Sequence, residues 1–489
     1  MKGMNSMKKT RFISLFLSLL IAASAVSCGS SNEDSKTTTN ASTSDTTAAE
    51  EDTSIHDDLP SRDFNDETIT FLVREELGYE FDAEQTGDVV DDAVFKRNQS
   101  ISERFNVNLE YIQTPGLWAS KADYQALITN SVMAGDNSYD IITGQSNIVL
   151  PLAVQGIYHD VANAEYIDFD KPYWKSGYHD NAMINGHLYS LMGDYALSTL
   201  TASNVMFFNT ALFEDYKVET PYELVKSGKW TLDAFTKMAI EFSQDLDGDG
   251  TIGENDLIGL YTNTNGINPI QYSTGCSLTS MGADGNQVID FPSEKEIDVF
   301  DKVFDFCNNE AVHVDSNLQI NQIAEAFINK KTAFVSGMLS IVDYLRDMKS
   351  DFGIVPFPKY DEDQENYITS VLRTVTVASI PTTVEDPGKC TFILEAMASD
   401  GYNYITPAYY EIALKGKYVR DEDTAEMLDI ISSTTYFAFF DVFYAELGGN
   451  SDMLSNYVTA GSQGLASFFE SRKSNLEQLL ENLYENYNK

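Results

Sequence analysis

The sequence predicts an α/β protein made of two lobes, and three observations lead to that prediction. Short apolar runs rich in β-branched residues alternate with stretches of helical spacing, which is typical of parallel strands joined by helices. Hydrophobic residues make up 43% of the chain, as expected for a globular protein. Beyond an expected signal peptide about 460 residues remain, which suits two lobes of about 200 residues each better than a single core.

The elements follow from these patterns in chain order. The run TITFLV at 68–73 predicts a first strand, and Val90, Val94, Ile101 and Phe105 share one face of a helix at 89–105. Strands are expected at 68–73, 108–112, 139–143, 188–192, 205–209, 332–335, 352–356 and 367–380. Helices are expected at 89–105, 124–133, 231–242, 296–308, 320–329, 387–399, 421–431 and 467–487.

Residues 1–27 predict a lipoprotein signal peptide. Basic residues precede an apolar run at 12–26 that is shorter than the roughly 20 residues of a membrane-spanning helix. The run ends in AVSCG, which resembles a bacterial lipobox, so we expect Cys28 to carry acyl chains and to hold the protein on the outer face of a cell membrane. Ordinary cleavage after Ala25, with Cys28 incidental, is the alternative.

Residues 28–59 and the overall charge limit the possible partners. Residues 28–59 consist mainly of Ser, Thr, Asn, acidic residues and Ala, which cannot bury enough apolar surface to fold, so we expect a disordered tether. The net charge of −43 repels nucleic acid and anionic lipid. We therefore expect no nucleic-acid partner, membrane contact through the lipid anchor only, and a monomer.

The order of several segments resembles the extracellular solute-binding proteins of sugar-type ABC importers, relatives of maltose-binding protein. The resemblance covers residues 60 to 489 and depends on order and spacing. It is carried by ERFNV at 103–107, YDII at 139–142, NGHLY at 185–189, MFFNTALF at 206–213, AFINKKTAF at 326–334, FGIVPFP at 352–358 and YYEIALKGK at 409–417.

The resemblance implies a two-lobed, periplasmic-binding-protein-like fold of type II with a hinge of crossing segments, expected near 193–196, 355–358 and 400. The first lobe would comprise 60–193 and about 356–398, and the second 194–355 and about 399–489. The implied function is capture of a sugar or oligosaccharide between the lobes and delivery to the importer's permease subunits, without catalysis.

Candidate ligand-binding residues follow from where the strands end. Loops beyond the carboxyl ends of strands form the sites of open α/β sheets, and a sugar needs aromatic faces together with polar partners for its hydroxyls. The candidates are Arg74, Glu75, Gln145, Ser146, Tyr173, Trp174, Asp194, Ser336, Gly337, Met338 and Arg373. Trp118 fits either a cleft lid or a surface anchor, whereas Trp230, next to the expected N-cap Thr231, is expected to pack in the core.

The segment DLDGDGTIGEND at 245–256 matches a calcium-binding loop of the EF-hand type. Carboxylates at positions 1, 3, 5 and 12, with Gly at position 6, supply the oxygen ligands and the sharp turn that Ca²⁺ needs. The expected ligands of a structural Ca²⁺ are Asp245, Asp247, Asp249, Thr251 and Asp256. A solvated acidic loop is the alternative.

Other chemistry finds little support in the sequence. The five His residues show no metal-ligand spacing, and no nucleophile elbow or P-loop occurs. Cys276, Cys307 and Cys390 are expected to be free, buried thiols, with one disulfide as the alternative. A secreted polysaccharide-active enzyme and a surface adhesin or sensory binding module remain the competing functions.

Overall fold

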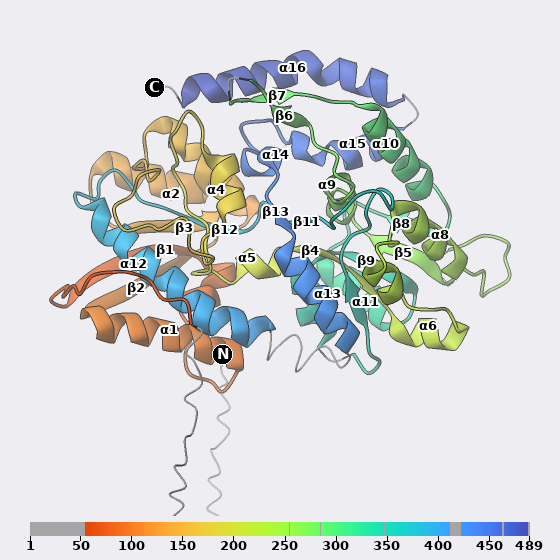
Figure 1. The fold of residues 1–489 in the computed structure, drawn as a ribbon, viewed down its shortest axis with the longest axis horizontal. Helices are drawn as coiled ribbons and strands as arrows, with labels where there is room; N and C mark the ends of the chain where they lie inside the picture. The colour runs from red at the N-terminus through yellow and green to blue at the C-terminus, as the bar shows by residue number, and fades with distance from the viewer. Residues whose placement is uncertain are drawn as a thin grey trace, which may run out of the picture. The chain divides into compact units, whose positions relative to one another are not determined.

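The computed structural model describes residues 54–253, 255–283, 285–346, 348–410, 422–461 and 464–487, and its strands form two main sheets. The first sheet has the order β12-β3-β1-β2 and the second the order β10-β4-β9-β5-β8. Figure 1 shows helices packed around each sheet, so the expected two lobes are present. The signal peptide and Cys28 lie outside the described residues.

The first sheet is parallel at its centre, as the alternation of strands and helices predicts. Its strands are β1 (Glu67–Arg74), β2 (Val107–Thr114), β3 (Ile141–Gln145) and β12 (Thr376–Ser379). β1 pairs in parallel with both β2 and β3, and β12 pairs antiparallel with β3. Every residue of β3 is buried, and its apolar residues Ile141 and Ile142 lie in the core.

The helix between β1 and β2 begins and ends at residues suited to those positions. In α1 (Val89–Phe105), the carboxylate of Asp88 accepts a hydrogen bond from the backbone N–H of Val90 at the N-terminus. Asn106 adopts the left-handed conformation, with φ 50°, at the C-terminus. The helix therefore has the bounds that its apolar spacing predicts.

The second sheet is mixed. Its strands are β4 (Asn204–Phe208), β5 (Ile258–Thr262), β8 (Val312–Val314), β9 (Thr332–Met338) and β10 (Gly353–Val355). β5 pairs in parallel with β8 and β9, whereas β4 pairs antiparallel with β9 and β10. The helix α8 (Leu232–Phe242) lies so close to β5 that a Cβ on Gly259 would come within 2.0 Å of the carbonyl oxygen of Ala239.

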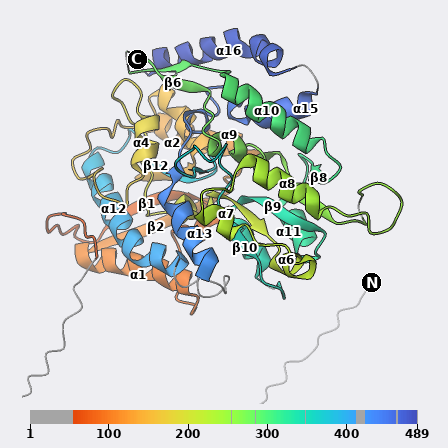
Figure 2. The same ribbon diagram turned by 45° about the vertical axis from the view of Figure 1, so that its right-hand side comes forward.

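The remaining elements surround these two sheets. The helices are α2 (Lys121–Ala134), α3 (Ser146–Val149), α4 (Ser176–Ala182), α5 (Ser198–Thr201), α6 (Thr210–Tyr216), α7 (Tyr222–Lys226), α9 (Pro269–Ser273), α10 (Glu294–Cys307), α11 (Ile320–Ile328), α12 (Pro387–Asp400), α13 (Glu422–Ser433), α14 (Phe439–Val442), α15 (Met453–Ala460) and α16 (Leu465–Asn486). The short strands are β6 (Thr279–Met281), β7 (Gln287–Ile289), β11 (Thr369–Ser370) and β13 (Thr435–Tyr436). The loop that follows α8 projects from the second lobe (Figure 2).

The chain crosses between the lobes in segments that touch one another. Gly401 of the third crossing lies against Asp194 of the first crossing. A Cβ on residue 401 would come within 1.9 Å of the carbonyl oxygen of Asp194, so glycine is required at this position. The middle crossing runs beside the first, because the N–H of Leu372 donates to the carbonyl of Ala202 at 3.0 Å. The crossings expected near 193–196 and 400 are therefore in contact.

The middle crossing lies further along the chain than 355–358. Residues 356–370 stay with the second lobe: the Trp230 indole donates to the carbonyl of Pro356 at 2.9 Å, and the N–H of Leu232 donates to the carbonyl of Lys359 at 2.7 Å. The chain passes to the first sheet at 371–375, just before β12. The expected strand at 367–380 is accordingly two short strands, β11 and β12, separated by a turn.

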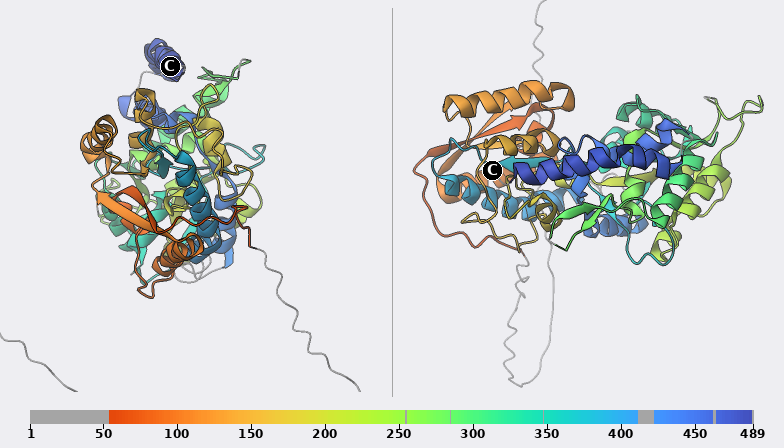
Figure 3. Two further views of the ribbon diagram at one scale, coloured as in Figure 1. Left: turned by 90° about the vertical axis from the view of Figure 1, so that its left-hand side faces the viewer. Right: turned by 90° about the horizontal axis from the view of Figure 1, so that it is seen from above.

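The C-terminal part of the chain contacts both lobes. The ring of Phe469 in α16 packs edge-on against Phe291 of the second lobe, with centroids 4.9 Å apart. At the other end of α16, the Asn185 side chain of the first lobe donates to the carbonyl of Tyr484 at 3.2 Å. Figure 3 shows α16 running along both lobes, so residues 399–489 do not belong to the second lobe alone.

Three further observations complete the comparison with the sequence. The expected strand at 188–192 is present only as an isolated bridge between Leu191 and Ala378. Cys276, Cys307 and Cys390 are free, and Cys276 and Cys390 are buried. Among the described residues, no helix combines the length and the apolar character that crossing a membrane requires.

Candidate functional site

The carboxyl ends of β1 and β3 meet the middle crossing at the junction of the lobes. A guanidinium N–H of Arg74 donates to the hydroxyl of Thr376 at 2.8 Å, and that hydroxyl donates to the carboxylate of Glu80 at 2.8 Å. Burial lowers the pKa of Arg74, and the negative charge of Glu80 counteracts this decrease. Next to them, the Ser146 hydroxyl donates to the carbonyl of Arg373 at 2.8 Å.

Arg373 is the centre of a buried charge network. Its guanidinium lies 3.2 Å from the Asp441 carboxylate and 3.1 Å from the Asp452 carboxylate. The same guanidinium stacks over the ring of Tyr444, 3.9 Å from its centroid. Burial raises the pKa of Asp441, and the positive charge of Arg373 counteracts the rise. The turn at the middle crossing therefore places a cation, held by two carboxylates, between the lobes.

An aromatic contact joins the first lobe to this network. The ring of Trp118, in the short 3₁₀ turn Trp118–Ser120, meets the Tyr444 ring edge-on at a centroid distance of 5.8 Å. The ammonium of Lys121 lies 3.7 Å from the Trp118 ring centroid. Trp118 remains 43% exposed, so part of the indole is accessible to solvent beside these contacts. This arrangement favours a lid over a surface anchor.

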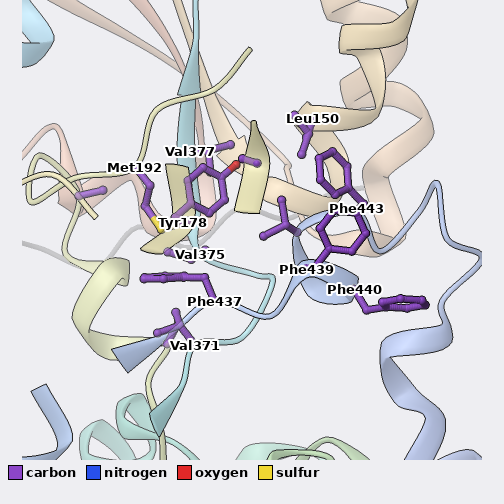
Figure 4. Packing of buried hydrophobic residues seen from close by; sticks show 14 of the residues in the cluster. Leu150, Tyr178, Met192, Val371, Val375, Val377, Phe437, Phe439, Phe440 and Phe443 are labelled. Carbon is purple, nitrogen blue, oxygen red and sulfur yellow. The ribbon is translucent and has the colours of Figure 1, made fainter. Parts of the chain in front are cut away.

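A small cavity of about 10 Å³ lies beside Arg373. Its lining residues come from the first lobe, the middle crossing and the C-terminal segment around α14, and are Ser146, Tyr178, Met192, Val371, Arg373, Val375, Phe437, Ala438, Asp441 and Val442. Figure 4 shows many of these apolar side chains packed against one another. A cavity of this size holds about one water molecule and has no room for a larger solute.

Several buried polar atoms near the interface have no hydrogen-bond partner among the described residues. They are Arg74 Nε, Gln145 Oε1, Asn147 Oδ1, both polar atoms of the Gln271 side chain and the Tyr272 hydroxyl. A buried donor or acceptor without a partner is costly, so such a group in a native protein calls for an explanation.

The structure gathers some of the predicted ligand-binding residues and separates others. Arg74, Gln145, Ser146 and Arg373 lie at the interface described above. Tyr173 and Trp174 are buried in the first lobe, where their hydroxyl and indole N–H donate to the two oxygens of the Glu395 carboxylate at 2.5 and 2.7 Å. Both rings are buried in the core and are not accessible to a ligand. Burial also raises the pKa of Glu395.

The other predicted residues have structural partners of their own. Asp194 is buried at the first crossing and pairs with Lys175 at 2.7 Å, while burial raises its pKa. The Ser336 hydroxyl donates to the carbonyl of Gly266 at 2.8 Å. The Met338 sulfur accepts a hydrogen bond from the Thr374 hydroxyl at 3.7 Å, which brings the end of β9 to the middle crossing.

Glu75 and Gly337 complete the predicted set. Glu75 is exposed in the 3₁₀ segment Glu75–Glu80 that follows β1. Gly337 lies in β9 with φ 157°, and a Cβ there would come within 2.8 Å of the Ile341 side chain.

Tyr444, Asp441 and Asp452 are site residues that sequence reasoning missed. They follow β13 in a segment without strand ends or a recognisable motif, and α14 brings them to Arg373 by packing on the first lobe. Their only signal in the sequence is a group of aromatic and acidic residues at 439–452. Tyr272 and Gln271 in α9 carried no signal of any kind.

The expected calcium ligands are partly assembled. One carboxylate oxygen each of Asp245, Asp247 and Asp249 lie within 4.8 Å of one another. Asp256 instead accepts backbone N–H groups, with Leu246 at 2.7 Å and Gly253 at 2.6 Å, and these bonds lower its pKa. Three hard oxygen donors at this separation fit Ca²⁺, whereas Asp256 organises the loop around them.

The Thr251 side chain faces the same loop. Its hydroxyl donates to the Asp249 carboxylate at 2.7 Å, so the carbonyl of Thr251 is the group that remains for an ion, as position 7 of an EF-hand loop requires. Glu254 lies outside the described residues.

Residues 99–402 match the family model of the bacterial extracellular solute-binding proteins. The chain belongs to this family. Its members are solute-binding receptors rather than enzymes, which agrees with the absence of catalytic motifs in the sequence. No curated protein matches the chain.

Solved structures share the two-lobed, type II periplasmic-binding-protein-like fold. The GacH receptor of Streptomyces glaucescens, solved unliganded and with acarbose, is 13% identical over 85% of this chain and 99% of its own, with a TM-score of 0.55. The maltose/maltodextrin-binding domain MalE of Bdellovibrio bacteriovorus, bound to maltotriose, is 14% identical over 86% and 100%, with a TM-score of 0.53.

A third solved structure is the galacto-N-biose/lacto-N-biose I-binding protein of an ABC transporter from Bifidobacterium longum, in complex with lacto-N-biose. It is 12% identical over 87% of this chain and 99% of its own, with a TM-score of 0.56. At such identities the similarity concerns the fold, and the contacts at the interface must come from this chain's own residues.

Proposed function

We propose that this solute-binding protein captures a sugar or oligosaccharide between its lobes and delivers it to the permease subunits of an ABC importer. The observation that carries the proposal is the convergence, at one interface, of the Trp118 and Tyr444 rings, the Arg373 guanidinium and buried polar atoms without partners. Aromatic faces accept the apolar C–H face of a pyranose, and buried amide and guanidinium groups pair with its hydroxyls. The solved relatives named above bind acarbose, maltotriose and lacto-N-biose.

Binding would proceed by hinge closure. The cavity of about 10 Å³ beside the middle crossing is too small for a sugar, so the solute would enter when the lobes are apart and be enclosed when they come together. Closure is favoured by the solute only because it makes more contacts in the closed state. Trp118 and Lys121 from the first lobe and Tyr444 from the C-terminal segment would close over it.

Two features would adapt the protein to the cell surface. Acylation of Cys28 would hold it at the extracytoplasmic face of a cell membrane, and the tether that begins at Cys28 would let it reach the permease. The predicted tether ends before residue 59, because Asp57 is buried and pairs with Arg104 at 2.7 Å. A Ca²⁺ ion bound by Asp245, Asp247 and Asp249 would stabilise the loop after α8 without touching the solute.

The test is a calorimetric titration of the protein with mono- and oligosaccharides, including maltotetraose, cellotetraose and lacto-N-biose. One of these solutes should bind to the wild type, and Trp118→Ala should weaken that binding by about tenfold, as expected for the loss of an aromatic contact. Met133→Ala is the matched control, because Met133 is 79% exposed on α2. Unchanged affinity in Trp118→Ala, or hydrolysis of the sugar, contradicts the proposal.

The anchor needs its own measurement. Membrane fractions of cells that produce the wild type should contain the protein, and mass spectrometry should detect a diacylglyceryl group on Cys28. Cys28→Ala should appear in the soluble fraction. A wild-type protein without lipid would limit the proposal to solute capture.

A further inference from the structure

A large cavity opens on the second lobe at a distance from the interface between the lobes. Its volume is about 680 Å³, whereas the cavity beside Arg373 measures about 10 Å³, and the two share no lining residue. Ligand sites in proteins have volumes of about 300–1,000 Å³. The larger cavity therefore has room for a ligand in the conformation that the structure describes.

Three parts of the second lobe form its walls. The edge strand β8 and its neighbour β5 supply Tyr261 and His313, which face each other in the strand register. The helix α11 turns one face toward the cavity, because Gln322, Glu325, Ala326 and Asn329 follow helical spacing. Ile252 and Gly253 of the projecting loop close one side.

The cavity has an aromatic surface at one wall. The rings of Tyr261 and His313 are stacked almost parallel, with centroids 4.6 Å apart and an interplanar angle of 9°. His313 is exposed, and Tyr261 is partly exposed. A stacked aromatic pair on an edge strand gives a rigid, flat surface that the C–H face of a sugar ring can cover.

Uncommitted polar groups surround these rings. The side chains of Glu310, Glu325, Asn329 and Lys331 line the cavity, and no hydrogen bond or ion pair joins them to any other described residue. They include both acceptors and donors. A hydroxyl group donates and accepts at once, so a polyol can satisfy a mixed set of this kind.

The charges select against other ligand classes. The cavity is lined by three carboxylates, Glu310, Asp315 and Glu325, and by one Lys, Lys331. Because the whole chain also carries a net charge of −43, anionic ligands are repelled. A purely apolar ligand would strip water from these charged groups without replacing its hydrogen bonds. A neutral saccharide fits both the aromatic wall and the polar rim.

We propose that the cavity between α11 and the β5–β8 edge is a second saccharide-binding site, outside the cleft and open to chains longer than the cleft can enclose. Such a site goes beyond the proposed function, because its ligand need not be transported. A polysaccharide held on the second lobe keeps its chain ends at a high effective concentration near the cleft. The site would thus serve to retain the protein on a polymer.

Affinity electrophoresis of the full chain in native gels tests the proposal. The gels contain soluble starch, barley β-glucan, arabinoxylan or galactomannan, and migration is compared with a gel without polymer. At least one polymer should retard the wild type. His313→Ala/Asn329→Ala should weaken that retardation by about tenfold in apparent affinity, since it removes an aromatic contact and a hydrogen-bonding group.

Two further variants make the result specific. Asn321→Ala changes an exposed residue of α11 that does not line the cavity and should be retarded like the wild type. Trp118→Ala should also be retarded like the wild type, although its binding of a solute in the cleft is weakened. Both residues of the double variant are exposed, so its melting temperature should match that of the wild type.

Each outcome decides for or against the second site. The second site is supported if the double variant is no longer retarded while Trp118→Ala still is. This conclusion holds even if no small sugar binds in the cleft. Absence of retardation in all four polymers, or retardation that only Trp118→Ala loses, overturns it. Loss of retardation on addition of spermidine, together with direct spermidine binding, shows a cation site instead and also overturns it.

Discussion

The guanidinium of Arg373 lies 3.9 Å from the centroid of the Tyr444 ring, in a conformation that two carboxylates hold. One face of Tyr444 is thereby covered by a cation, and the Trp118 ring of the first lobe meets the same ring edge-on. A sugar that binds here has to take the place of a contact between protein side chains. The cation fixes Tyr444, so we expect Trp118 to be the ring that moves.

Arg373→Met should destabilise the protein strongly. The substitution leaves the buried carboxylate of Asp441 without its counter-charge, and breaking a buried pair in this way costs about 3–5 kcal/mol. The measurement is the free energy of unfolding in urea. Arg62→Met is the control, because Arg62 pairs with Asp386 at 3.4 Å and lies 4.4 Å from the Phe64 ring centroid, but is more exposed.

The control should lose about 1 kcal/mol or less, as exposed pairs do. Equal losses in the two variants would show that the Arg373 network is no more buried in solution than a surface pair. Arg373→Met/Asp441→Asn should recover part of the loss, because the uncompensated charge is then absent.

Calcium should raise the melting temperature of the wild type. A ligand that binds only the native state stabilises it by about 2.7 kcal/mol when its free concentration is about 100 times its Kd. Asp245→Asn should abolish the increase, since it removes one of the three converging carboxylates. The measurement is thermal unfolding with EDTA and with added Ca²⁺.

Asp256→Asn separates loop folding from ion binding. The Asp256 carboxylate accepts backbone N–H groups of Leu246, Asp247 and Gly253, so its loss should lower the melting temperature even in EDTA. A wild type whose melting temperature is the same with and without calcium would contradict the metal site.

The sequence predicts the lobes better than it predicts the interface. α1 has the predicted bounds because its apolar face, its N-cap Asp88 and its C-terminal Asn106 all agree. The strands predicted at 68–73, 108–112 and 139–143 overlap β1, β2 and β3. Buried β-branched residues mark β1 and β3, whereas β2 shows an alternation of exposed and partly buried residues. These are local properties, which sequence patterns record.

The interface depends on contacts between segments distant in the chain. Arg373 was selected because it lies in a predicted returning strand, yet it sits in a turn, and its partners Asp441 and Asp452 are about 70 to 80 residues away. Tyr173 and Trp174 had suitable chemistry for a sugar, but the buried Glu395 takes both of their polar groups. Composition does not distinguish an aromatic that packs from one that binds.

Gly401→Ala should disturb the hinge. A Cβ at residue 401 would come within 1.9 Å of the carbonyl oxygen of Asp194, which is backbone and cannot rotate away. Overpacking of this kind costs about 1–3 kcal/mol, so the melting temperature should fall by several degrees. Gly186→Ala is a comparison site without steric conflict, although its φ of 83° adds strain. Equal stability of Gly401→Ala and the wild type would mean that the crossings separate in solution.

The stability of the protein should fall as the pH rises from about 4.5 to 7, and Glu446 should cause part of the fall. Both oxygens of its carboxylate are buried without a partner among the described residues, and burial raises its pKa to about 7 from the ordinary 4.5. The folded state thus binds a proton that the unfolded state releases in this range, so deprotonation favours unfolding. The titratable groups that interact electrostatically with Glu446 are the hydroxyls of Tyr178 and Tyr487, and both stay neutral over this pH range.

Glu446→Gln isolates this contribution, because the amide does not titrate. We expect the variant and the wild type to have similar free energies of unfolding at pH 4.5, and the variant to be more stable at pH 8 by up to about 3 kcal/mol. Urea unfolding at both pH values measures the difference. Glu485→Gln, a change on α16, is the control and should follow the wild-type profile. If the two variants have the same pH profile, Glu446 is solvated in solution and its burial at this position is not maintained.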